Sequence, residues 1–301
     1  MKGYRINMEL PLEESLKTVI LGCIAFVQDQ IQNRQDVHVP VHETRRTIKR
    51  IRAVLRMIRD EIGYSNYYRE NTFYRELARG ISSLRDHYVL LNTVTGFHEK
   101  YPEEFPENVV AAISKSLNRD LEEDIEHFSS QSGGFDRIME ELEKAVSRVD
   151  QYCRLRDGFV SIRKGIRRIY GRGGRYLKII KESYDKEQFH EYRKNTKYLL
   201  YQMELIRPVY PKMIKAYVST IDRHAEMLGD TRDYERLEKY IRDMPGSTRT
   251  AASRLKLVEA IHSRRQGMMN SIFSGANRIY AETPGEFTRR LGMYWEPKQQ
   301  K

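Results

Sequence analysis

Residues 42–49 read HETRRTIK, and residues 190–197 read HEYRKNTK. Both octapeptides follow the pattern H-E-x-R-[RK]-x-x-K. The dipeptides Arg85-Asp86 and Arg232-Asp233 follow the two octapeptides at nearly the same distance along the chain. A matched pair of motifs at a matched offset indicates an internal duplication. The sequence therefore predicts two copies of one unit, over about residues 1–145 and about residues 150–285.

The spacing of apolar residues around these motifs predicts helices. Apolar side chains recur with the 3.6-residue period of a helix that faces a core. The stretches with this period are residues 12–31, 42–58, 73–91, 135–149, 162–180, 189–206 and 216–237. No stretch alternates in the manner of a strand. The predicted fold class is all-α, built as helical bundles.

Each octapeptide opens a row of basic side chains along one edge of its helix. On a helical wheel, residues on the side of His42 lie opposite Ile48, Ile51 and Val54. This first row consists of His42, Arg45, Arg46, Lys49, Arg52 and Arg56. The second row consists of His190, Arg193, Lys194, Lys197 and Tyr201. A third basic helix, over residues 162–180, adds Arg163, Lys164, Arg167, Arg168, Arg175 and Lys178.

Such rows are unfavourable unless something offsets their charge. Like charges at i, i+3 and i, i+4 repel by a few tenths of a kcal/mol per pair. The simple interpretation is a solvated face whose acidic partners come from other helices, for example from the cluster at residues 122–126. Two copies with the same residues in phase favour a binding face instead. Arginine suits that role because its planar fork binds phosphate oxygens and stays charged.

The composition agrees with an acidic partner. The chain has 301 residues and a formal net charge of +11, which favours nucleic acid, phosphate polymers or an anionic membrane. Cys23 and Cys153 form neither a disulfide framework nor a metal-binding spacing. The N-terminus lacks a secretory signal pattern, and the apolar run at residues 19–27 is too short to span a bilayer. We expect a soluble cytoplasmic protein that needs no cofactor and no metal.

These residues resemble the CHAD family, the conserved-histidine α-helical domain, over nearly the whole chain. The resemblance is carried by both octapeptides, by Leu84-Arg85-Asp86, by the RRIYGR stretch at residues 167–172 and by the LGDTRD stretch at residues 228–233. It implies one domain over residues 1–301, made of two pseudo-symmetric antiparallel four-helix bundles that enclose a basic central groove or pore. It also implies binding of inorganic polyphosphate and association with polyphosphate granules. The stretch Tyr198-Leu199-Leu200 departs from the family, because a basic residue is expected before the tyrosine.

Three functions compete on this sequence. Non-catalytic binding of inorganic polyphosphate is favoured, with the seventeen residues of the three basic helices as its contacts. Nucleic-acid binding is the second reading, against which few aromatic residues other than Tyr170 and Tyr201 accompany the basic rows. An enzyme or metal-dependent protein acting on phosphorylated substrates is the third, but no nucleophile-and-base spacing or carboxylate cluster lies near the rows. The two Arg-Asp dipeptides are interpreted as structural.

Overall fold

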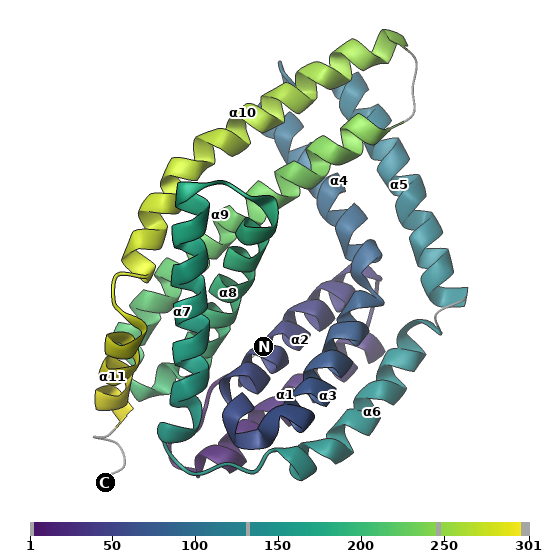
Figure 1. Cartoon of the computed structure of the whole chain (residues 1–301). Helices are drawn as coiled ribbons and strands as arrows, with labels where there is room; N and C mark the ends of the chain where they lie inside the picture. The colour runs from purple at the N-terminus through teal and green to yellow at the C-terminus, as the bar shows by residue number, and fades with distance from the viewer. Residues whose placement is uncertain (1–2, 131–132, 245–247, 296–301) are drawn as a thin grey trace. The chain divides into compact units, whose positions relative to one another are not determined.

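The computed structural model describes residues 3–130, 133–244 and 248–295, and this part of the chain is α-helical without a strand. Figure 1 shows the helices in chain order. Their bounds are α1 Leu12–Gln32, α2 His38–Met57, α3 Arg59–Arg79, α4 Ser82–Lys100, α5 Glu107–Ser130 and α6 Gly134–Tyr152. Then follow α7 Val160–Glu182, α8 Lys186–Leu205, the short 3-10 helix η1 Arg207–Val209, α9 Pro211–Asp243, α10 Thr248–Ile279 and α11 Pro284–Trp295. The predicted all-α class is confirmed.

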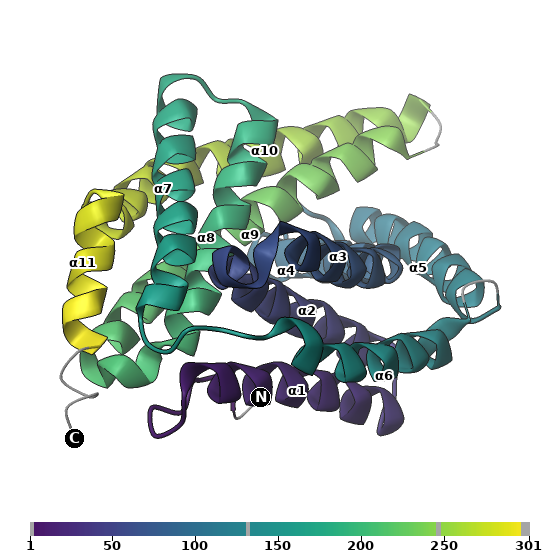
Figure 2. The ribbon, with the colours of Figure 1, turned by 60° about the horizontal axis from the view of Figure 1, so that its bottom comes forward.

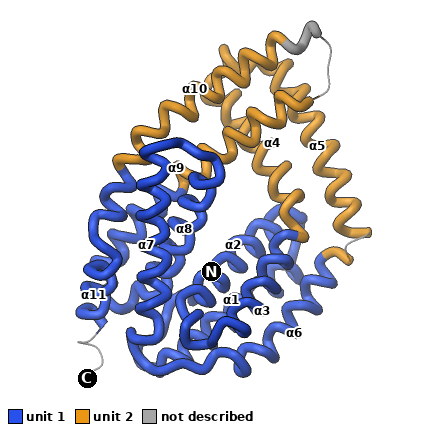
Figure 3. The backbone as a smooth tube through the Cα atoms, viewed as in Figure 1, with its two compact units in different colours: residues 1–79, 135–225, 275–301 blue, residues 80–134, 226–274 orange. Residues whose placement is uncertain are grey.

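The chain divides into two compact units, coloured in Figure 3. Unit 1 comprises residues 1–79, 135–225 and 275–301, and unit 2 comprises residues 80–134 and 226–274. Each unit thus takes residues from both predicted repeats. The repeat boundaries stay a prediction.

Unit 1 is built on the periodic helices. In α1 the side chains of Leu16, Ile20 and Ile24 are fully buried, and α1 packs along α2. Figures 1 and 2 both show α7 beside α8 on one side and α11 on the other, as the packing contacts require. These helix edges stabilise the fold mainly by burying apolar surface, which contributes about 25 cal/mol for each Å² removed from water.

Local signals set where the basic helices begin. The Asp36 carboxylate accepts hydrogen bonds from the backbone N–H groups of His38 and Val39, at 2.6 and 2.9 Å, so α2 begins four residues before His42. Asp185 caps α8 in the same way, accepting from the N–H of Gln188 at 2.8 Å. Such caps satisfy N–H groups that have no partner inside the helix.

One predicted helix is wrong. The apolar period over residues 73–91 predicts a continuous helix, but α3 ends at Arg79 and α4 begins at Ser82. The side chain of Ile81 is fully buried at the break, so the apolar spacing continues although the helix does not. Periodicity reports which side chains face the core, and a buried turn can satisfy it as well as a helix can.

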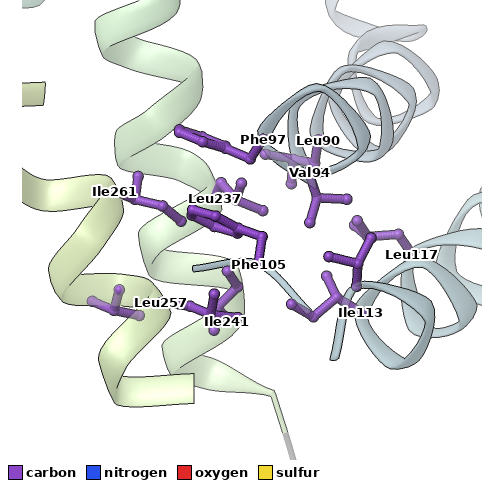
Figure 4. Close-up of a cluster of buried hydrophobic side chains, with 12 residues drawn as sticks. Leu90, Val94, Phe97, Phe105, Ile113, Leu117, Leu237, Ile241, Leu257 and Ile261 are labelled. Carbon is purple, nitrogen blue, oxygen red and sulfur yellow. The ribbon is translucent and has the colours of Figure 1, made fainter. Parts of the chain in front are cut away.

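Unit 2 has a separate apolar core, drawn in Figure 4. Phe97 of α4 stacks on Phe105 with ring centroids 4.7 Å apart, and Leu237 and Ile261 close the cluster from α9 and α10. The Arg236 guanidinium donates to the Asp86 carboxylate at 2.7 Å, which gives that aspartate a structural partner. A second ion pair, between Arg265 and Glu238 at 2.8 Å, is buried.

Candidate functional site

The first basic row runs along α2 at the boundary between core and solvent. Ile48, Ile51 and Val54 on the apolar edge are fully buried. All six row members are partly exposed, in contrast to this apolar edge. The sequence wheel therefore assigned the two edges of this helix correctly.

Helices α2 and α8 pack against each other in antiparallel directions. The Gln202 side-chain amide donates to the carbonyl of Ala53 at 3.3 Å. On one side of this crossing Arg50 meets Glu204 at 3.3 Å, and on the other Arg56 lies 4.0 Å from the ring centre of Tyr198. Higher residue numbers on α2 thus meet lower residue numbers on α8, as expected for antiparallel helices.

This antiparallel arrangement decides where the two rows lie. His42 is about 16 Å from the crossing along its helix and His190 about 18 Å along the other, at about 1.5 Å per residue. The two rows extend from the crossing in opposite senses along the helix pair. They do not stand side by side at the same level.

Arg52 and Arg56 form the most distinctive part of the site, which we call the arginine pair. The Arg52 Nε donates to the Asn71 Oδ1 at 3.2 Å, and the Arg56 Nη1 donates to the same oxygen at 2.5 Å. Among the described residues, no carboxylate lies within 4.0 Å of either guanidinium. Burial lowers the pKa of Arg52, and the neighbouring charges of Arg56 and Arg75 act in the same direction. The amide satisfies hydrogen bonds without neutralising the charge of the pair.

Other members of the rows are partly neutralised. Arg46 pairs with Glu43 at 2.8 Å, Lys194 pairs with Glu191, and Lys197 lies 3.8 Å from Asp222. The Arg45 guanidinium donates to the carbonyl of Ala78 at 2.7 Å, which fixes its direction without adding negative charge. His42 lies 3.9 Å from the Glu43 carboxylate.

Tyr201 is placed differently from the rest of its row. Its side chain is buried, and the Arg50 guanidinium lies 5.8 Å from its ring centre. Burial raises the pKa of Tyr201 to about 12. The helical wheel predicts the direction in which the Tyr201 side chain leaves the axis of α8. It does not predict that Arg50 of α2 lies over that side chain.

The third basic helix, α7, is continuous through its glycines. Five of its six predicted cations are exposed, whereas the arginines and lysines of the other two rows are only partly exposed. In the described part of the chain, no carboxylate lies within 4.0 Å of Arg163, Lys164, Arg167, Arg175 or Lys178. Arg168 alone among the predicted residues here is paired, with Asp60 at 2.6 Å. A concavity of about 650 Å³ is lined by Lys164, Arg167, Arg168, Gly171, Arg172, Arg175, Thr283, Pro284 and Gly285.

The concavity brings together four of the predicted cations and adds one further cation to them. Arg172 lies one turn beyond Arg168 and was outside the prediction, although the same helical spacing identifies it. No residue of the rows on α2 and α8 lines this concavity. The predicted contacts thus fall on two surfaces of unit 1, the α2–α8 pair and the α7 face.

Two further properties concern metals and membranes. Within residues 3–130, 133–244 and 248–295, no three His, Cys, Asp or Glu side chains are grouped as metal ligands would be. None of the helices described is at once long enough and apolar enough to cross a membrane.

Comparison with known proteins identifies a similar solved structure and a matching family. The crystal structure of the CHAD domain from the plant Ricinus communis superposes with a TM-score of 0.64 and 14% sequence identity, covering 92% of this chain and 95% of that chain. Among curated proteins no match is found. The family model of the CHAD domain matches residues 20–242, well over half of the sequence. The chain therefore belongs to the CHAD domain family.

Proposed function

We propose that the chain binds inorganic polyphosphate through the basic rows of α2 and α8 and the face of α7. The binding is non-catalytic, so the polymer is not hydrolysed. The arginine pair is the observation that carries this proposal. Two partly buried guanidinium groups share one amide oxygen, and no carboxylate among the described residues lies within 4.0 Å of either. A linear polyanion supplies that missing charge, and its binding releases counterions.

Length and direction also support a linear ligand. The rows extend in opposite senses from the Ala53–Gln202 crossing, so together they suit a polymer better than a compact anion. Polyphosphate carries a negative charge on every unit and could engage many cations at once. Retention of the protein on polyphosphate granules would follow from the same contacts.

A binding role is also consistent with the chemistry of the two thiols. Cys23 and Cys153 are buried, and burial raises the pKa of each thiol to about 12. Both thiols are therefore protonated at neutral pH and are poor nucleophiles. Incubating the protein with polyphosphate and measuring orthophosphate tests this part. Release that is lost on mutating Arg52 or Arg56 would establish turnover and overturn it.

Charge reversal tests the binding itself. Lys49→Glu and Lys197→Glu each change one row, and each should weaken binding of long-chain polyphosphate about tenfold or more, because a charge-assisted contact becomes a repulsion. Lys115→Glu makes the same change in net charge on an exposed position of unit 2 and is the matched control. Titration by fluorescence anisotropy gives the three affinities.

The fold should survive these substitutions, since both lysines lie away from the buried edges of their helices. Thermal melts of all three variants check this. Wild-type affinity in both row variants would show that the rows are ordinary solvated faces. An equal loss in Lys115→Glu would show that net charge, and not the rows, governs binding.

A further inference from the structure

Helix α3 carries two tyrosines that face solvent. The side chains of Tyr64 and Tyr68 are 66% and 56% exposed, the two largest exposed fractions among the tyrosines. Their ring centroids are 6.0 Å apart and their planes differ by 24°, so the rings form a short stack one helical turn apart. We call this pair the tyrosine ladder. Large aromatic side chains bury more surface than most, and leaving two of them in water gives up that stabilisation.

The backbone before the ladder is specialised. Gly63 has φ of 78° and ψ of 161°, a conformation that side chains other than glycine adopt only with strain. The chain bends there, with Ile62 buried before the bend and Tyr74 buried three turns after it. The helix after Gly63 therefore has a fixed inner side and presents Tyr64 and Tyr68 on its outer side.

A cation lies against the first ring of the ladder. The Arg59 guanidinium lies 5.6 Å from the ring centre of Tyr64 and 5.1 Å from that of Tyr67. Tyr67 in turn lies within the electrostatic range of Arg52, one member of the arginine pair. Through Arg59 and Tyr67 the ladder therefore lies near the arginine pair of the α2 row.

The acidic residues near the ladder are all paired. Arg168 binds Asp60 at 2.6 Å, and Arg156 binds Glu61 at 2.6 Å. Glu70 is fully buried, where Arg148 and Arg69 bind it at 3.0 and 2.7 Å. The Asp60–Arg168 pair also joins the first turn of α3 to α7. The residual charge around the ladder is therefore positive.

We propose that the tyrosine ladder is a stacking platform for single-stranded nucleic acid. Two neighbouring bases stack on Tyr64 and Tyr68, while the backbone phosphates lie on Arg59 and the cations of α7. Parallel aromatic rings beside unpaired cations are the combination that single strands recognise, because every base has a π-face and every unit a phosphate. Polyphosphate has no planar group, so the proposed polyphosphate binding gives the exposed rings no role. The two proposals share the cations of α7, but this one rests on the exposed rings and not on the proposed polyphosphate binding.

Matched oligonucleotides test the proposal directly. The probe is a labelled single-stranded 20-mer, compared with a 20-mer of the same backbone in which all bases are missing. Wild-type protein should bind the base-containing strand at least about tenfold more tightly, because stacking contributes strongly for each base. Equal affinity for the two strands would overturn the proposal, since the binding would then be electrostatic alone.

Variants locate the effect. Tyr64→Ala with Tyr68→Ala should lower affinity for the base-containing strand about tenfold or more, and leave the abasic strand and polyphosphate within about twofold. Tyr64→Phe with Tyr68→Phe keeps the rings and should bind as wild type. Tyr184→Ala with Tyr210→Ala removes two other exposed tyrosines and is the control. An unchanged alanine variant, or an equal loss in the control, would remove the ladder from the mechanism.

Two additional outcomes are decisive. If ATP competes with the strand at concentrations close to the strand's own affinity, the platform binds mononucleotides and the assignment to a strand is wrong. If the alanine variant also loses polyphosphate, the rings belong to the polyphosphate site and the nucleic-acid proposal fails. Loss of polyphosphate in the Lys49 and Lys197 variants, with base-dependent binding intact, would leave this proposal standing.

Discussion

Single residues show how charge is kept available or removed in this molecule. Asn71 leaves the charge of Arg52 and Arg56 in place, whereas Glu204 offsets that of Arg50 at 3.3 Å. Arg50 is then covered by Tyr4 and Tyr201, with its guanidinium 5.0 and 5.8 Å from their ring centres. Whether the partner is an amide or a carboxylate thus decides whether the charge of an arginine is left in place or offset.

His224 offers a residue-scale prediction. It is buried, it shares a hydrogen bond of 2.6 Å with the Tyr192 hydroxyl, and its Nδ1 has no partner. Burial lowers its pKa from 6.5 to about 4. The folded protein therefore keeps it neutral while the unfolded chain takes up a proton below pH 6.5. Stability falls as the pH falls from 6.5 to 4, and by about 2 kcal/mol between pH 7 and pH 5.

The measurement is urea unfolding of wild type and His224→Gln at pH 7 and pH 5. Glutamine keeps a polar partner for Tyr192 and does not titrate. The variant should lose about 2 kcal/mol less than wild type between the two pH values. The carboxylates protonate alike in both proteins, so the difference isolates the histidine. The same pH dependence in both would show that His224 is not kept neutral in the fold.

At the scale of helices, the packing of α7 on α2 depends on one small residue. A Cβ placed on Gly165 would lie 2.0 Å from the carbonyl oxygen of Met57, which is backbone and cannot move aside alone. Gly165→Ala should therefore destabilise the fold by about 3 kcal/mol or more through overpacking. The close approach holds the basic face of α7 on its side of unit 1.

Gly22 is the matched control for this prediction. It lies exposed within α1, and an added Cβ there meets nothing within 4 Å. Gly22→Ala should stabilise the protein by about 0.5–1 kcal/mol, because alanine restricts the unfolded chain and favours helix. Thermal melts of both variants decide the matter. Comparable stability of the two would show that α7 can move away from α2.

The helices also show what the sequence could and could not predict. Periodicity located α1, α2, α7 and α8, because each buries a single continuous edge. It missed α5, where apolar residues are sparse among acidic ones, and it joined α3 to α4 across a buried turn. The direction of each basic row was predictable from one helix. The cover over Tyr201 was not, because it depends on which other helix lies against it.

Neither the tyrosine ladder nor the arginine pair could be predicted from the sequence, and the reason is the same. Tyr64, Tyr67 and Tyr68 are visible in the sequence, but only the structure shows that two of them stay exposed. The absence of a carboxylate beside Arg52 likewise depends on which residue of α3 meets α2, and that residue is Asn71. Residue spacing within one helix determines which side chains share a face. Contacts with other helices determine whether a cation on that face is neutralised.

At the scale of the whole molecule, the net charge of +11 is less important than its arrangement. At physiological salt the Debye length is about 8 Å, so a cation farther than that from a bound polymer contributes little. The two rows lie on one antiparallel helix pair and together extend well beyond that distance. Their combined effect on a polymer therefore requires the polymer to reach both.

Chain length should reveal this arrangement. A polyphosphate long enough to reach from one row to the other gains the second set of contacts intramolecularly, so its affinity should rise more steeply than its number of phosphates. Once both rows are occupied the affinity should level off.

Lys197→Glu weakens one row and should flatten this steep rise. The affinity for short chains that bind on the α2 row should stay unchanged. Lys115→Glu should keep the wild-type curve. Affinities over a length series, at fixed salt, make the comparison. Parallel curves for wild type and Lys197→Glu would mean that the rows bind separately, and the polymer then would not span the helix crossing.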